Sequence, residues 1–209
     1  MKLVDAPLAA LQKPVLAVFD FDGTISDRHT FWRYCRFIAT PLVFWPSLLP
    51  LLPSMLGVII GKTPLMTARS RFIRCFLGNL TQAEEAQYAA RFIAGPLQQW
   101  LRPAALRRLR WHQAQGHRTI LVSNAPENYL RPWGKSVGFE QVCGTRLEVK
   151  QGRLSGRVDG LDCVGAEKVR RLREAAGELD RYYIYAYGDS DGDLELLQVA
   201  DSPFYRNWY

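Results

Sequence analysis

Residues 15–24 read VLAVFDFDGT, an apolar run that ends directly in two carboxylates, Asp20 and Asp22, and a glycine. A short apolar run followed by Asp and Gly is typical of a buried strand and the loop after it. Late in the chain the pattern returns, with YYIYAY at 182–187 followed by GDSDGD at 188–193. In open α/β sheets ligands bind at the C-terminal ends of the strands. Both acidic clusters are therefore expected at one site.

Carboxylates that meet at one site repel each other unless a cation lies between them. Oxygen ligands suit hard cations, and Mg²⁺ is commonly held by one or two carboxylates together with substrate phosphates. The clusters therefore predict a Mg²⁺ site and chemistry on a charged oxygen substrate. Asp20 is the candidate nucleophile, and Asp22 is the candidate acid and base for the leaving oxygen and the water. Thr24 is a candidate phosphate ligand.

One further strand, a helix and a hairpin are expected between these clusters. Thr119–Ser123 follows a glycine and reads as a strand, and Glu167–Ala176 has the apolar spacing of a helix. Residues 146–158 contain two β-like runs around Gln151 and Gly152, which predicts a hairpin. Strands that alternate with helices indicate an α/β fold, a Rossmann-like parallel sheet core with helices on both faces.

The stretch between the first two strands is too long for an ordinary connection. We expect a separate helical insert, or cap, at 27–103 and a catalytic core built from 1–26 and 104–209. Thr81 and Glu84 have the spacing of a capping box that opens a helix running through Phe92.

An uncharged apolar segment, 37–61, lies inside the insert and is long enough to span a membrane. Asp20 precedes it and Asp189 follows it, so a single crossing would separate two residues of one site. Two interpretations stay open, a buried core of the cap or a broken hairpin that enters one leaflet. Prolines argue against one straight helix; they are Pro41, Pro46, Pro50 and Pro53. Basic residues flank the segment, as near anionic headgroups; they are Arg33, Arg36, Lys62, Arg69, Arg71 and Arg74.

The length, the cysteine content and the charge distribution indicate a cytoplasmic protein of one domain with a basic insert. The 209 residues suit one domain with an insert. Four cysteines without paired spacing indicate reduced thiols in the cytoplasm, and no secretory signal is recognisable at the N-terminus. Residues 28–118 hold 13 Lys or Arg and only two Asp or Glu. The rest of the chain holds 14 Lys or Arg and 18 Asp or Glu. The insert therefore attracts anionic partners. A nucleic-acid partner is not expected, because it would leave the acidic motifs unexplained.

These stretches resemble the motifs of the haloacid dehalogenase superfamily of phosphohydrolases. The matching elements, in the order of the family, are Asp20–Thr24, the strand ending Ile120–Ser123, Lys168, and Gly188 with Asp189 and Asp193. The resemblance spans nearly the whole chain, and the family places its helical cap where this chain has its insert. It implies a phosphatase that works through an aspartyl-phosphate.

The resemblance also implies the metal ligands. Asp20, the backbone carbonyl of Asp22, and Asp189 would bind Mg²⁺. Asp193 would orient a water ligand of the metal or brace Lys168.

A second group of residues would contact the substrate. By the same resemblance, Ser123 and Lys168 would hold the phosphoryl oxygens and stabilise the transition state. Candidate substrate contacts beyond the motifs are Asn124, His29, Arg69 and Arg71, with Arg74 as a further headgroup contact.

Within the superfamily, the chain resembles the branch of phosphatidylglycerophosphatase C and, more distantly, of phosphoserine phosphatase. The resemblance to the former rests on the length, the proline-broken apolar segment and the residues around Lys168. Phosphoserine phosphatases carry an acidic residue where this chain has His29, which counts against phosphoserine. The resemblance implies a lipid phosphate such as phosphatidylglycerophosphate, hydrolysed by a peripheral or monotopic protein at the anionic inner face of the membrane. A soluble phosphatase for a phosphoserine-like or histidinol-phosphate-like metabolite is the alternative.

Overall fold

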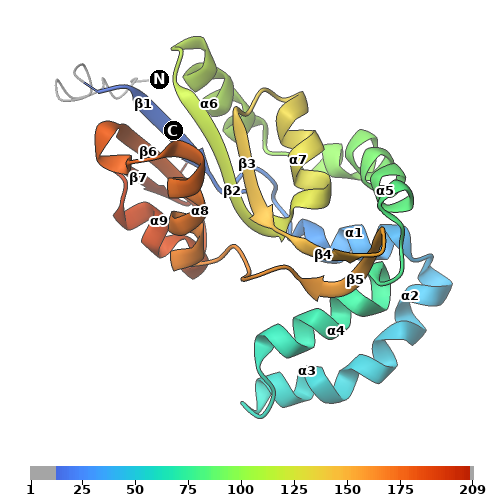
Figure 1. The fold of residues 1–209 in the computed structure, drawn as a ribbon. Helices are drawn as coiled ribbons and strands as arrows, with labels where there is room; N and C mark the ends of the chain where they lie inside the picture. Colours follow the sequence, from blue (N-terminus) through green and yellow to red (C-terminus); the bar gives the residue numbers. More distant parts are fainter. Residues whose placement is uncertain (1–12, 208–209) are drawn as a thin grey trace.

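The computed structural model describes residues 13–207; the expected absence of a signal concerns a terminus that lies largely outside this range. Its centre is a five-stranded sheet in the order β3-β2-β1-β6-β7 (Figure 1). Every neighbouring pair of strands is parallel. The strands are β1 (Val15–Phe19), β2 (Arg118–Pro126), β3 (Gln141–Thr145), β6 (Tyr183–Gly188) and β7 (Ser202–Tyr205).

Strand β1 lies in the middle of the sheet because its residues are almost wholly apolar and buried. Phe19, at its end, pairs with Leu121 of β2 and with Tyr187 of β6. The C-terminal ends of the three strands therefore meet at one edge. The three strands expected from the sequence are confirmed.

Helices cover both faces of the sheet, as the α/β pattern predicts. On one face, α6 (Pro103–Ala114) and α7 (Glu127–Ser136) contribute Leu109 and Trp133 to the same buried cluster as Phe19. On the other, α8 (Ala166–Ala176) and α9 (Leu194–Gln198) contribute Leu172 and Leu196. The chain also contains short 3₁₀ turns; they are η2 (Leu49–Leu51), η3 (Pro96–Trp100), η4 (Leu179–Arg181) and η5 (Asp191–Asp193).

A helical insert follows β1. Its helices are α1 (Thr30–Ile38), α2 (Pro41–Leu48), α3 (Leu52–Ile59), α4 (Leu65–Leu77) and α5 (Gln82–Ala94). The expected capping box is present, because the Thr81 hydroxyl accepts the N–H of Glu84 and the Glu84 carboxylate accepts the N–H of Thr81.

The predicted hairpin is also present and lies beside the insert. It consists of β4 (Leu147–Lys150) and β5 (Arg153–Val158), which pair antiparallel. Strand β5 lies against α4 (Figure 1). The approach is close at Gly156, where a Cβ would lie 2.5 Å from Cα of Arg74.

The apolar segment is helical but interrupted. Residues 41–59 are long and apolar enough to cross a membrane by length and composition. A 3₁₀ turn separates α2 from α3, and Pro46 lies inside α2. Only 22% of the apolar window is buried, and the exposed fractions of Leu42 and Ile59 are 88% and 79%. Most of this segment therefore lies on the surface, while Phe44 and Leu51 are buried in the hydrophobic core.

Candidate active site

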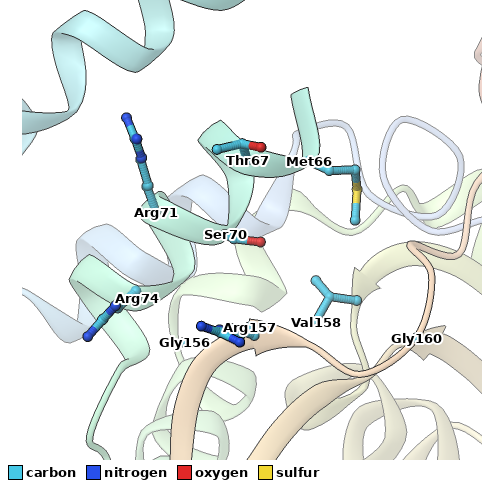
Figure 2. A pocket seen from close by; sticks show the side chains of 9 residues that line it. All are labelled: Met66, Thr67, Ser70, Arg71, Arg74, Gly156, Arg157, Val158 and Gly160. Carbon is cyan, nitrogen blue, oxygen red and sulfur yellow. The ribbon is translucent and has the colours of Figure 1, made fainter. Parts of the chain in front are cut away.

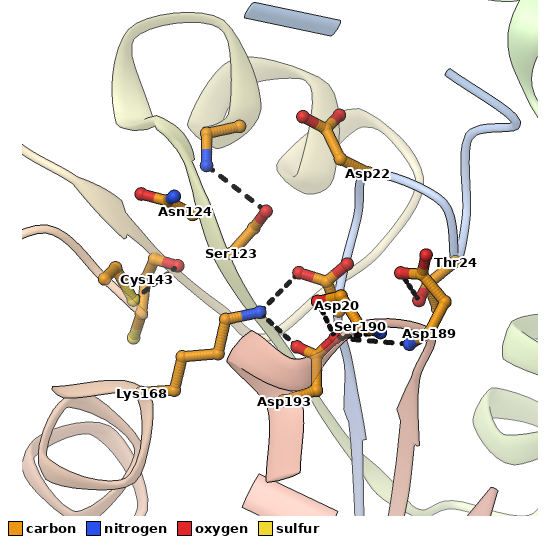
Figure 3. A network of polar contacts seen from close by, with 12 residues as sticks. Asp20, Asp22, Thr24, Ser123, Asn124, Cys143, Lys168, Asp189, Ser190 and Asp193 are labelled. Carbon is orange, nitrogen blue, oxygen red and sulfur yellow. Dashed lines mark hydrogen bonds and ion pairs between the residues drawn. The ribbon is translucent and has the colours of Figure 1, made fainter. Parts of the chain in front are cut away.

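The C-terminal edge of the sheet gathers the charged residues that the sequence singled out (Figure 3). Asp20 directly follows β1, Ser123 lies in β2, and Asp189 directly follows β6. Lys168 extends toward them from the first turn of α8, and Asp193 from η5. Four segments far apart in sequence thus converge on one point.

Lys168 is buried between two carboxylates. Its Nζ lies 2.6 Å from Oδ1 of Asp20 and 2.5 Å from Oδ1 of Asp193. Burial lowers the pKa of Lys168, but the two carboxylates outweigh it and hold the pKa above its ordinary value. Burial also raises the pKa of Asp20 from 3.8 to about 7, although Lys168 opposes this rise. One cation therefore only partly compensates the negative charge of the site.

The carboxylates suit a hard cation. Oxygen atoms of Asp20, Asp189 and Asp193 all lie within 4.8 Å of one another. Burial and the nearby Asp193 raise the pKa of Asp189, so its ionised form lacks full compensation within the protein. An all-oxygen donor set with uncompensated charge fits Mg²⁺.

Asp193 is committed to hydrogen bonds within its own loop. Its Oδ2 accepts the N–H groups of Asp189 and Ser190 at 3.2 and 3.0 Å, and the Ser190 hydroxyl at 2.8 Å. Burial raises the pKa of Asp193, while Lys168 and Ser190 lower it, and the net direction is downward. Of the roles expected for Asp193, this geometry favours bracing Lys168 and the loop that carries Asp189.

Gly23 leaves the space that Asp189 occupies. Its φ is +84°, and a Cβ there would lie 2.1 Å from Oδ2 of Asp189. Thr24 holds the same carboxylate, because its hydroxyl donates to Oδ1 at 3.3 Å. The glycine is therefore required by both the backbone conformation and the close approach.

We predict that Gly23→Ala weakens Mg²⁺ binding by about 10- to 100-fold, because the added methyl displaces the carboxylate of Asp189, a candidate ligand. Isothermal titration calorimetry measures this change. Gly116→Ala is the matched control, since Gly116 also has a positive φ, +72°, but a Cβ there meets nothing within 4 Å. Equal Mg²⁺ affinity in both variants would refute the assignment of Asp189 as a ligand.

The Asp22 side chain points away from Asp20 (Figure 3) and contacts Thr30 of the insert. Its Oδ1 accepts the Thr30 hydroxyl at 2.5 Å and the Thr30 N–H at 3.0 Å. The Thr30 hydroxyl also lies 2.8 Å from the hydroxyl of Tyr129 in α7. Burial raises the pKa of Asp22, although the two hydrogen bonds that Thr30 donates to it oppose the rise. A carboxyl group with a raised pKa keeps its proton to higher pH, as a general acid requires.

Ser123 and Asn124 lie near the C-terminal end of β2, beside the carboxylates. Ser123 is buried, and its Oγ accepts the N–H of Ala125 at 3.3 Å. The Asn124 side chain accepts the Thr145 hydroxyl at 3.1 Å, so one of its polar atoms is already engaged. The Asn124 carbonyl accepts Nη2 of Arg69 at 2.8 Å.

Arg69 joins the insert to the catalytic core. Besides its bond to Asn124, its Nε lies 3.0 Å from Oδ1 of Asp162, which is buried. His29 is exposed just before α1, and its proximity opposes the rise in the pKa of Asp22 and of Asp189. Sequence reasoning missed Thr30, Tyr129 and Asp162, because no local pattern singles them out.

Arg71 and Arg74 lie apart from Arg69, on another side of α4. They line a pocket of about 370 Å³ between α4 and β5 together with Arg157 (Figure 2). The Arg71 and Arg74 side chains extend away from the hollow in Figure 2, so the three arginines give this face positive charge without enclosing an anion site. The structure therefore divides the arginines expected to contact substrate between two places.

Comparison with known proteins agrees with this geometry. The family model for haloacid dehalogenase-like hydrolases matches residues 17–198. Protein CicA of Caulobacter vibrioides is 33% identical over 196 residues, which cover 93% of this chain and 86% of CicA.

Solved structures show the same fold. A protein of unknown function from Bordetella pertussis Tohama I has a TM-score of 0.80 at 22% identity, covering 92% of this chain and 90% of its own. A phosphoserine phosphatase, solved as a phospho-aspartyl intermediate analogue, has a TM-score of 0.59 at 18% identity, covering 92% and 86%.

Proposed function

Since this chain belongs to the haloacid dehalogenase-like hydrolase family and is an enzyme of the phosphatase type, we propose that it is a Mg²⁺-dependent phosphomonoester hydrolase. Asp20 is its nucleophile, and its substrate is a lipid phosphate such as phosphatidylglycerophosphate. The observation that carries the catalytic proposal is the convergence of Asp20, Lys168 and Asp189 at the ends of β1 and β6.

The first step forms an aspartyl-phosphate. A carboxylate oxygen of Asp20 attacks phosphorus, and the bond from phosphorus to the alcohol oxygen breaks. Asp22 donates its proton to that oxygen, so the product leaves as an alcohol. Lys168 and the Ser123 hydroxyl hold the phosphoryl oxygens. When bound by Asp20, Asp189 and the Asp22 carbonyl, Mg²⁺ supplies positive charge that offsets repulsion between Asp20 and the phosphate dianion.

The second step restores the enzyme. Asp22, now ionised, takes a proton from water, and the water oxygen attacks phosphorus. The bond between phosphorus and Asp20 breaks, which releases inorganic phosphate. Before the first of these steps, Asp22 must turn from Thr30 toward the leaving oxygen. Because Thr30 is the first residue of α1, the position of the insert and the orientation of Asp22 are linked.

A lipid substrate is supported by the surface of the insert. The exposed apolar residues of α2 and α3 suit the acyl region of a membrane. The positive charge of Arg71, Arg74 and Arg157 on the neighbouring face attracts anionic headgroups (Figure 2). Together these features support the proposal of a peripheral or monotopic enzyme at the cytoplasmic face of the membrane. A soluble metabolite phosphatase is the alternative, and it assigns no role to the exposed apolar surface.

We predict Mg²⁺-dependent phosphate release from phosphatidylglycerophosphate in mixed micelles. The double variant Leu42→Asp, Ile59→Asp should lower kcat/KM for the micellar lipid about 10- to 100-fold, measured relative to kcat/KM for the soluble ester p-nitrophenyl phosphate. The reason is that burying even one such apolar side chain contributes about 1.5–3 kcal/mol. Val149→Asp is the control, since Val149 is exposed on β4 outside the apolar segment. Turnover of soluble esters alone would keep the mechanism and reject the lipid substrate.

A further inference from the structure

An apolar groove lies within the insert, separate from the basic pocket. It has a volume of about 420 Å³. Its walls come from α1, η2, α3 and α4 and are apolar except for Arg69; among them are Trp32, Met55, Val58, Ala68 and Phe72. Ligand pockets commonly occupy about 300–1,000 Å³, so the groove is large enough for a flexible apolar ligand.

The inner end of the groove borders the catalytic residues. Phe31, which lines it, follows Thr30, the residue whose hydroxyl donates to Asp22. Arg69 lines it as well and donates to the carbonyl of Asn124, the residue after Ser123. A ligand in the groove therefore has one end close to the phosphate site.

The outer part of the groove is continuous with the exposed surface of the insert. Met55, Ile59 and Leu65 line the groove and are 42%, 79% and 69% exposed. The same surface is the one that the proposed function sets against the membrane. An apolar chain that starts beside Arg69 thus extends along an otherwise apolar lining to the exposed surface of the insert.

Charge decides which kind of ligand fits. Arg69 is already paired with Asp162 and lies 5.7 Å from the centre of the Phe31 ring. Its charge is therefore compensated, and the groove lacks a free charge for an anion among the residues that line it. A straight hydrocarbon chain attached to a phosphate matches an apolar groove that begins beside a phosphate site.

We infer that this groove binds one acyl chain of the substrate while its phosphate lies at Asp20. The inference rests on the proposed function and adds to it the site that determines which acyl-chain lengths the enzyme prefers. Each methylene group removed from water strengthens binding about fourfold. The enzyme therefore selects substrates by the length of the chain that enters the groove, up to the length that fills it.

The test uses n-alkyl phosphates from butyl to decyl phosphate as monomers in solution, so no bilayer or micelle contributes. For the wild-type enzyme kcat/KM should rise about fourfold per methylene and then level off. In Ala68→Phe the ratio of octyl to butyl phosphate should fall at least tenfold, because the ring occupies the groove. Ala90→Phe is the matched control, since Ala90 is exposed on α5, outside the groove.

A second variant guards against misfolding of Ala68→Phe, and a binding measurement tests the groove without any turnover. Val58→Phe fills the groove from the opposite wall, on α3. In the inactive Asp20→Asn protein, a brominated alkyl phosphate should quench the fluorescence of Trp32, which lines the groove. This quenching should be lost in Asp20→Asn with Trp32→Phe and reduced in Asp20→Asn with Val58→Phe.

The outcomes separate the two proposals. A flat chain-length series in the wild-type enzyme without quenching would overturn the groove inference, even if micellar lipid is hydrolysed. A rising series with quenching supports the groove, even if phosphatidylglycerophosphate is not a substrate. If no ester is hydrolysed, the quenching alone decides for or against the groove.

Discussion

Asp20→Asn should abolish phosphate release, with kcat lowered on the order of 10⁶-fold, as when a covalent nucleophile is removed. Asparagine has nearly the shape of aspartate but cannot form the acyl-phosphate. The measurement is phosphate release with Mg²⁺ under saturating substrate. Asp159→Asn is the control, because Asp159 is exposed and follows β5, which is not a strand of the parallel sheet that carries the site. Turnover within tenfold of wild type would remove Asp20 from the catalytic role.

The same variant changes how stability depends on pH. The pKa of Asp20 is raised to about 7 by burial, above its ordinary value of 3.8. A raised pKa contributes stability that is present below pH 4 and is lost as pH rises to about 7. Without added metal, the wild-type protein should therefore lose stability across this window relative to Asp20→Asn. Thermal unfolding at pH 5 and pH 7.5 measures the difference, and parallel curves would contradict the raised pKa.

Lys168→Met should destabilise the metal-free protein by about 3–5 kcal/mol, the cost of breaking a buried ion pair. The Lys168 side chain is 3% exposed and contacts Asp20 and Asp193, which would lose their shared counter-charge. Added Mg²⁺ should restore part of the stability, because it supplies positive charge at the same carboxylates. Activity should fall about 10²- to 10³-fold with the loss of a transition-state contact.

Urea unfolding with and without Mg²⁺ measures the first effect of Lys168→Met. Lys135→Met is the matched control, because Lys135 is exposed near the end of α7, and it should change stability by no more than about 0.5 kcal/mol. If Lys168→Met were as stable as Lys135→Met, the ammonium group would not compensate the carboxylates. Normal activity of Lys168→Met would reject its proposed role in holding phosphate.

The sheet could be predicted from the sequence because each central strand is a short apolar run followed by a polar loop. Val15–Phe19 and Tyr183–Gly188 are buried on both faces, so they contain almost no polar residue. The parallel order then follows from alternation with helices. The convergence of Asp20 and Asp189 is predictable for the same reason, since both follow such strands.

The contacts around Asp22 could not be predicted in this way. Thr30 and Tyr129 are 99 residues apart, and their hydroxyl groups meet only because the fold brings the start of α1 to Tyr129 of α7. The surface position of 37–61 also needed the structure, because an apolar composition suits a buried core and a membrane-facing surface equally. The groove between α1, α3 and α4 depends on packing that no residue pattern encodes.

The most direct test of the account is to trap the phosphorylated residue. The enzyme is mixed with Mg²⁺ and its phosphomonoester substrate, quenched in acid and reduced with borohydride, which converts an aspartyl-phosphate to homoserine. Peptide mass spectrometry should then find homoserine at position 20, only when substrate was present. Homoserine at position 22 or 189, or phosphate release without any trapped residue, would contradict the covalent role of Asp20.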